Sequence, residues 1–238
     1  MNKVLVKSAF TVSLLLILMA IPVYGADVNK SLSVAAGGQS DGESTVNGSI
    51  TVGDGATISG GLKTVNGKIR VGDNSVIEDA GTVNGSITIG SGVKSAALST
   101  VNGSIELSEQ AFASAVSAVN GHIRLEKGAS TSDDLSNVNG KIDLEGATVG
   151  GDVTTVNGGV ELSDAAVIEG DLIVKKPHGW GNHEAHPPEI VIGPGSKVKG
   201  KISLERKVKL YISDSAEVGS VEGVMSMADA VQFSGERP

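Results

Sequence analysis

A short motif built on Val-Asn-Gly returns seven times at an almost fixed interval. The copies stand at residues 45–50, 64–69, 82–87, 100–105, 118–123, 137–142 and 155–160, and three of them read TVNGSI without change. Successive copies lie 18 or 19 residues apart, as measured at Asn47, Asn66, Asn84, Asn102, Asn120, Asn139 and Asn157. A fixed period of this length is typical of solenoids, in which each repeat packs on its neighbours.

An eighth copy begins the series. The segment VNKSLSV at 28–34 matches VNGSITV at 46–52, with Lys30 in place of the glycine. The repeats therefore start close to residue 28. Lys30 and the less regular tail are candidates for the two ends of a stack, where unpaired strand edges need protection.

A finer rhythm divides each repeat into three steps. Aliphatic residues recur every six positions, for example at Val46, Val52 and Ile58. The two 19-residue repeats carry their extra residue in the same step, at 58–65 and at 131–138. A strand cannot absorb one residue without reversing its inward and outward side chains, whereas a turn can. We therefore expect a corner at this step.

One step of every repeat alternates apolar and polar residues. Two aliphatic columns flank a polar residue, and the columns are formed by Ile50 and Val52, Ile69 and Val71, Ile87 and Ile89, Ile105 and Leu107, Ile123 and Leu125, Ile142 and Leu144, and Val160 and Leu162. Such alternation predicts a strand with one buried face.

Two all-β architectures accommodate a strand every six residues. In a parallel β-helix each repeat is one coil, and equivalent residues stack at the strand spacing. In an antiparallel meander, Asn-Gly closes two-residue hairpins. The threefold rhythm favours a single-domain parallel β-helix of about 18 residues per coil.

The repeated Asn-Gly is predicted to form a corner of that coil. Asn tolerates the left-handed backbone conformation and Gly adopts it freely, so we expect a sharp turn between two inward aliphatic residues. Stacked asparagines can also hydrogen-bond in a ladder. The seven asparagines are thus predicted to be structural.

The rhythm continues beyond the last Asn-Gly copy. Ile192, Val198, Leu204 and Leu210 keep the six-residue step. A histidine-containing insert interrupts it, and because Val174 and Ile192 are 18 residues apart the insert is expected to occupy one coil. The expected organisation is a signal peptide at 1–25, a β-helix at 26–224 with a loop insert at 175–189, and a C-terminal cap or tail at 225–238.

Two family resemblances accompany this pattern. The segments VIEGDLIV and IVIGPGSKVKGKI resemble the bactofilins, and the VNGSI series is similar to bacterial putative-adhesin repeats. The bactofilin resemblance implies a right-handed β-helix that forms polymers, so the right-handed coil is favoured. Cytosolic bactofilins generally lack a cleaved secretory signal. This protein differs from them, because its N-terminal segment resembles such a signal.

That segment has the features of a secretory signal peptide. Lys3 and Lys7 precede an apolar run at 12–21 that ends in small residues, which predicts cleavage near Gly25 or Ala26. An uncleaved anchor is the alternative, although the run is short for a membrane span. The expected location is periplasmic, cell-surface or secreted, with no transmembrane span in the mature protein.

The amino-acid composition limits the kinds of binding partner that this protein can have. Without the two signal lysines, 17 basic residues face 27 acidic ones, which argues against a nucleic-acid partner. The protein has no cysteine, so its order must come from packing and backbone hydrogen bonds. Aromatic residues make up 3% of the sequence, in keeping with a thin aliphatic core.

The insert holds the residues with the clearest binding chemistry. Imidazoles beside a carboxylate can bind Zn, Cu or Ni, which makes a candidate metal site of His178, His183, His186 and Glu184. A plain surface loop is the alternative, because prolines and glycines flank the histidines. Trp180 is a candidate contact for a glycan or a protein.

The sequence as a whole predicts a non-enzymatic, exported structural or adhesin-like protein of the bacterial cell envelope that needs no cofactor. It is expected to act by surface display or by self-association through the coil ends, with an envelope protein or a glycan as possible ligand. The alternatives are a polysaccharide-binding or polysaccharide-cleaving β-helix and a metal-binding envelope protein. A β-helix can host several of these functions, so fold alone does not choose among them.

Overall fold

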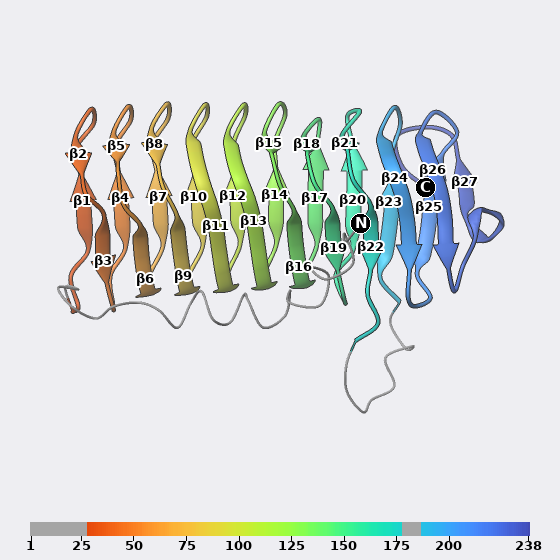
Figure 1. The fold of residues 1–238 in the computed structure, drawn as a ribbon, viewed down its shortest axis with the longest axis horizontal. Helices are drawn as coiled ribbons and strands as arrows, with labels where there is room; N and C mark the ends of the chain where they lie inside the picture. The colour runs from red at the N-terminus through yellow and green to blue at the C-terminus, as the bar shows by residue number, and fades with distance from the viewer. Residues whose placement is uncertain (1–27, 178–186) are drawn as a thin grey trace, which may run out of the picture.

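A computed structural model describes residues 28–177 and 187–238, and it consists almost wholly of short strands. The strands wind into a parallel β-solenoid of about ten coils, with roughly 19 residues in each. Figure 1 shows the coils following one another along the long axis, from the red N-terminal end to the blue C-terminal end. Among the described residues, no helix has the length and apolar character needed to cross a membrane.

The first face of the solenoid is a sheet of 11 strands, one from each successive coil. Its strands, in spatial order, are β1 (Leu32–Val34), β4 (Ile50–Val52), β7 (Ile69–Val71), β10 (Ile87–Ile89), β12 (Ile105–Leu107), β14 (Ile123–Leu125), β17 (Ile142–Glu145), β20 (Val160–Ser163), β23 (Glu189–Ile192), β25 (Lys209–Ser213) and β27 (Val231–Phe233). Each strand is thus the neighbour of its counterpart in the next coil.

The other two faces join into a second sheet of 16 strands. The second face contains β2 (Gln39–Ser40), β5 (Thr57–Ile58), β8 (Val76–Ile77), β15 (Ser130–Thr131), β18 (Thr148–Val149) and β21 (Val167–Ile168). The third contains β3 (Glu43–Thr45), β6 (Leu62–Asn66), β9 (Ala80–Asn84), β16 (Leu135–Asn139), β19 (Val153–Thr155) and β22 (Leu172–Val174). Four longer strands run through both faces, namely β11 (Lys94–Asn102), β13 (Phe112–Asn120), β24 (Lys197–Leu204) and β26 (Glu217–Gly223).

Equivalent residues of neighbouring coils stand side by side. Ile87 pairs with Ile105, and Ile105 pairs with Ile123, in parallel register. All pairings between the described strands are parallel. The predicted parallel β-helix is therefore confirmed and the antiparallel meander is excluded, while the hand of the coil stays a prediction.

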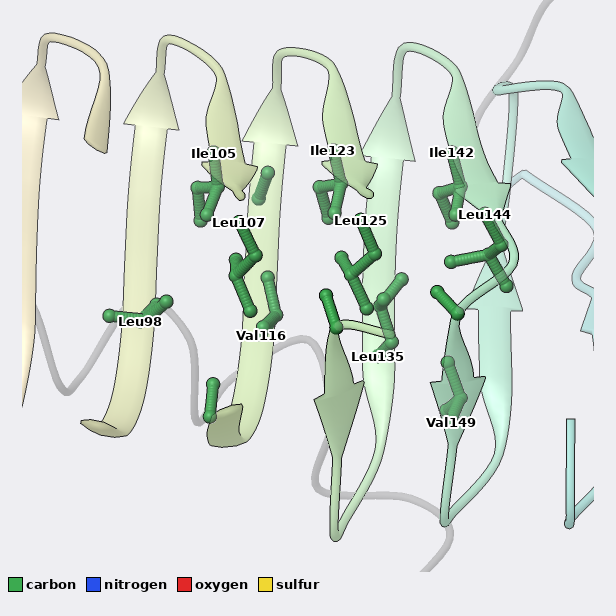
Figure 2. Close-up of a cluster of buried hydrophobic side chains, with 14 of the residues drawn as sticks. Leu98, Ile105, Leu107, Val116, Ile123, Leu125, Leu135, Ile142, Leu144 and Val149 are labelled. Atoms are coloured by element: carbon green, nitrogen blue, oxygen red, sulfur yellow. The ribbon is translucent and has the colours of Figure 1, made fainter. Parts of the chain in front are cut away.

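The core is a narrow column of aliphatic side chains. The fourteen residues of the two columns identified in the sequence are all buried. Figure 2 shows part of this stack, in which Ile105 and Leu107 repeat as Ile123 and Leu125 in the next coil. Burial of each such residue contributes about 1.5–3 kcal/mol. None of the buried hydrophobic residues described is aromatic, as the composition suggested.

The valine of Val-Asn-Gly does not face the core, which corrects the expectation that this corner lies between two inward aliphatic residues. Val65 and Val83 are half-buried on the outside, whereas the preceding Thr64 and Thr82 point inward and are fully buried. The alternation set by Leu62 in β6 decides the facing, because successive strand residues point to opposite sides. The six-residue rhythm predicted the inward position at the valine, and the structure has it one residue earlier, at the threonine.

The extra residue of the 19-residue repeats lies at a corner, as predicted. Gln39 pairs with Thr57, eighteen residues on, whereas Glu43 pairs with Leu62, nineteen residues on. The additional residue therefore falls between the second and third faces. The strands on either side keep their register.

The insert is an addition to one coil and does not replace a coil. Leu162 pairs with Ile192, and Val174 pairs with Leu204, each at a separation of 30 residues. Val174 and Ile192 lie in different sheets, so their 18-residue spacing is a coincidence of numbering. The backbone leaves the stack after β22 and re-enters at β23 with twelve more residues than an 18-residue coil needs.

The tail completes the stack and then turns back. After a 3-10 turn at Met227–Asp229, β27 adds the outermost strand of the first face. Beyond it, Arg237 donates to Glu161 of β20 at 2.9 Å, 76 residues earlier in the sequence. The C-terminal segment thus crosses the outer surface of the last coils.

Candidate functional site

The repeated asparagines form one continuous ladder along a corner of the solenoid, called here the asparagine ladder. In every rung the Nδ2 of one asparagine donates to the Oδ1 of its counterpart in the preceding coil, over 2.7–2.9 Å. The ladder runs through Asn29, Asn47, Asn66, Asn84, Asn102, Asn120, Asn139 and Asn157. All bonds point the same way, so the two ends of the ladder are chemically different.

The ladder has a distinct partner at its C-terminal end. Arg206 Nη1 donates to Asn157 Oδ1 at 2.9 Å and to the carbonyl oxygen of Val156 at 3.2 Å. The two following coils carry no asparagine in this column, and a guanidinium supplies the missing donor. Arg206 lies in this column two coils on, since Thr155 pairs with Val174 and Val174 with Leu204, but the insert hides that register in the sequence.

The glycine after each motif asparagine from 47 to 157 is required by contact between coils more than by backbone conformation. Of the seven motif glycines, only Gly103 and Gly140 have positive φ, and no motif asparagine from 47 to 157 does. A Cβ on Gly67 or Gly85 would lie 1.8–1.9 Å from the carbonyl oxygen of the preceding motif glycine. The predicted left-handed corner is therefore wrong at most copies.

The same contact explains Lys30. A Cβ on Gly48 would lie 2.1 Å from the Lys30 carbonyl oxygen, since each Cβ in this column points toward the preceding coil. Lys30 belongs to the first of the described coils and can carry a side chain there. In the glycine column, a side chain would meet the carbonyl group of a coil stacked before it.

The threonine of the motif contributes a bond that the sequence interpretation missed. Thr64, Thr82 and Thr100 are buried, and their hydroxyls donate to the glycine carbonyl of the preceding coil at 2.8–3.0 Å. Asn137 does the same through its Nδ2 at 2.6 Å. The signal was present, because Thr precedes Val-Asn-Gly in five of the seven copies.

The aspartates of the glycine turns also join neighbouring coils. Asp54 Oδ1 accepts a hydrogen bond from the backbone N–H of Asp73 at 2.9 Å, and Asp73 accepts one from Ser91 at 2.8 Å. Asp134, which follows Asp133 directly, accepts a hydrogen bond from the N–H of Asp152 at 2.8 Å. These carboxylates are committed to main-chain donors.

The residues predicted to bind metal or ligand lie in the part of the insert outside the described residues. They are His178, His183, His186, Glu184 and Trp180. Within 28–177 and 187–238, no three His, Cys, Asp or Glu side chains are grouped to hold a metal ion.

A charged groove of about 500 Å³ lies on the first face, over β14, β17 and β20. Its charged side chains include Arg124, Lys141, Asp143, Glu145, Glu161 and Arg237, and we use the name charged groove for this set. Lys141 Nζ contacts Asp143 at 2.6 Å and also Glu161, and Arg124 contacts Glu145 at 2.7 Å. The half-exposed His122 extends the network through Asp143, 3.1 Å away.

Ion pairing sets the protonation of the groove. Burial raises the pKa of Glu161, but hydrogen bonds and charges from Lys141 and Arg237 outweigh it, so the pKa lies below its usual value. Burial lowers the pKa of Lys141, and its bonds to Asp143 and Glu161 more than offset this and raise the pKa. Both groups are therefore charged near neutral pH.

Comparison with protein-family models, with curated proteins and with solved structures found no match to this protein.

Proposed function

We propose that this is an exported, non-enzymatic structural or adhesin-like protein of the bacterial cell envelope. The observation that carries this proposal is that the repeated polar side chains serve to hold the coils together. The ladder asparagines, buried threonines and turn aspartates all bond one coil to the next. The product is a regular rod, and about ten coils at about 4.8 Å each give a length of roughly 50 Å.

The state of the groove carboxylates supports a non-enzymatic role. A glycosidase needs a carboxylic acid whose raised pKa keeps it protonated near neutral pH. Glu161 has the opposite shift, and Asp143 and Glu145 are bound to Lys141 and Arg124. These carboxylates stabilise the face on which they lie.

Self-association is proposed to use the C-terminal end. Val224, Met227 and Val231 are 55%, 39% and 54% exposed, which gathers apolar surface near the last coil. At the opposite end, Lys30 occupies the column in which the following coils carry glycine, and a Cβ added to those glycines meets the carbonyl group of the preceding coil. Exposed strand edges and apolar clusters are the usual routes to association between copies.

Export is tested by expressing the full-length protein in a bacterial host and sequencing the N-terminus of the product in each cell fraction. The proposal predicts a product outside the cytosol that begins near Ala26. A control with Leu15→Arg and Ile17→Arg breaks the apolar run and should stay in the cytosol. Wild-type protein that stays in the cytosol and begins at Met1 would overturn the proposal.

A polysaccharide-binding role is the second candidate, and the charged groove favours it. Donors from Arg124, Lys141 and Arg237 lie there beside carboxylate acceptors on the first face. Glycan-array binding of the wild type should then be lost in Lys141→Ala and kept in Lys63→Ala, which lies on the third face. Equal binding by both variants would remove the groove from the account.

A further inference from the structure

Each of the seven motif copies contains an Asn-Gly peptide bond, a site of spontaneous covalent change. The backbone nitrogen of the glycine loses its proton and attacks Cγ of the asparagine. A new N–C bond closes a cyclic imide, the bond between Cγ and Nδ2 breaks, and ammonia leaves with the proton. Water then opens the ring to aspartate or isoaspartate. Glycine has no side chain to hinder the attack, and Asn is among the thermolabile residues.

The ladder opposes the first requirement of this reaction, rotation of the carboxamide toward the backbone. Asn102 Nδ2 donates to Asn84 at 2.9 Å, and its Oδ1 accepts from Asn120 at 2.9 Å. The carboxamide is therefore held on both sides. This restraint is shared by all seven motif asparagines, because Arg206 supplies the last acceptor bond at Asn157.

The second requirement, a free glycine N–H, separates the copies into two groups. Gly85, Gly103 and Gly121 donate their N–H to the asparagine carbonyl of the following coil at 3.0–3.1 Å. Within the described residues, the corresponding bond is not formed by Gly48, Gly67 or Gly140. At Gly158 the N–H donates instead to Thr155 Oγ1 at 3.2 Å.

We infer that Asn47, Asn66 and Asn139 are the sites at which the folded protein converts to aspartate and isoaspartate, while Asn84, Asn102 and Asn120 are protected. A hydrogen-bonded N–H must break its bond before the nitrogen can lose the proton and attack, so the central glycines react more slowly. This inference does not depend on the proposed function.

Conversion has a defined structural consequence. An aspartate in a rung lacks the Nδ2 donor and places a carboxylate oxygen against the Oδ1 of the preceding coil. Isoaspartate also lengthens the backbone by one carbon, which shifts the register of a strand pair. Because the susceptible copies flank the protected centre, ageing of the protein opens the ladder from its outer parts.

The test is peptide mapping by mass spectrometry of the whole mature protein after days in warm, mildly alkaline buffer. In the folded protein, Asn84, Asn102 and Asn120 should convert about tenfold more slowly than Asn47, Asn66 and Asn139, the factor that one good hydrogen bond represents. In urea all seven sites should convert at similar rates. Equal rates in the folded protein, or faster conversion at the centre, would overturn the inference.

A second measurement uses Arg206→Ala, which removes the donor to Asn157 Oδ1. Conversion at Asn157 should rise several-fold, while conversion at Asn102, three coils away, stays as in the wild type. An equal rise at Asn102 would contradict the inference, because protection would then reflect overall stability and not the local bonds.

Discussion

Arg206 Nη1 lies 2.9 Å from Asn157 Oδ1, although the two residues are 49 positions and two coils apart in the same column of the solenoid. The contact ends a ladder that runs through eight asparagines. A ladder of amides always leaves one acceptor at its end. Here an arginine takes the place of the next asparagine and lets the last coils depart from the motif.

Replacing Arg206 with Ala should lower the free energy of unfolding by about 1 kcal/mol, the net value of a partly exposed hydrogen bond. Arg206→Lys should recover only part of this loss, since the lysine ammonium lies one bond closer to the backbone than Nη1. Urea unfolding followed by circular dichroism measures both. An Arg206→Ala variant as stable as the wild type would show that the contact does not contribute.

The glycine column should tolerate no side chain. Gly85→Ala places a Cβ 1.8 Å from the Gly67 carbonyl oxygen, so we expect the coils to separate and the protein to lose most of its stability. Gly55→Ala is the control, because Gly55 has open space but a φ of +66°. It should cost only on the order of 1 kcal/mol of backbone strain. Similar melting temperatures for the two variants would refute the contact argument.

The buried motif threonines should be needed for their hydroxyl and not for their volume. Thr82→Val keeps the shape but leaves the Gly67 carbonyl without its donor, which should cost about 1–3 kcal/mol. Thr82→Ser should restore most of the loss. If Thr82→Val unfolds at the same urea concentration as the wild type while Thr82→Ser does not, the hydroxyl bond is unimportant.

Stability should depend on pH through Glu161. Its pKa is lowered in the folded protein, so it stabilises the fold above the unfolded value of about 4.3 and loses that contribution as the pH falls through the folded pKa. Glu161→Gln should therefore be less stable than the wild type near neutral pH, by on the order of 1 kcal/mol for a solvent-screened pair.

The difference should disappear near pH 3. Urea midpoints at both pH values measure it, with Glu106→Gln as control, since Glu106 lies on the same face outside the groove. A difference that persists unchanged in acid would show that Glu161 acts by packing and not by charge.

Much of the fold could be predicted because the repeat imposes it. The alternation at Ile50 and Val52 set the inward columns, and the extra residue at 58–65 located a corner. The structure of the motif differs from the sequence prediction in two respects. Val65 faces outward and Thr64 inward. The glycine is needed because a Cβ at its position would clash with the neighbouring coil, and a single repeat does not reveal that contact.

The contacts at the end of the asparagine ladder and at the C-terminus could not be predicted from the sequence. Arg206 reaches Asn157 and Arg237 reaches Glu161 across 49 and 76 residues. Arg206 lies in the asparagine column two coils on, but the insert and the loss of the motif hide that register in the sequence, and Arg237 lies beyond the last strand. A repeating sequence predicts only the contacts that recur in every coil. The groove and the end of the ladder depend on residues that break the period.

The central claim is that each coil stacks in parallel on the one before, and disulfide formation tests it most directly. The protein has no native cysteine, and Thr88 and Glu106 are paired on neighbouring coils. Strands about 4.8 Å apart place these Cα atoms within the limit of about 7 Å for a disulfide. We predict that Thr88→Cys/Glu106→Cys oxidises within one molecule and that Ser99→Cys/Glu106→Cys, the pair expected of a hairpin at Asn102, does not. The reverse result would contradict the parallel solenoid.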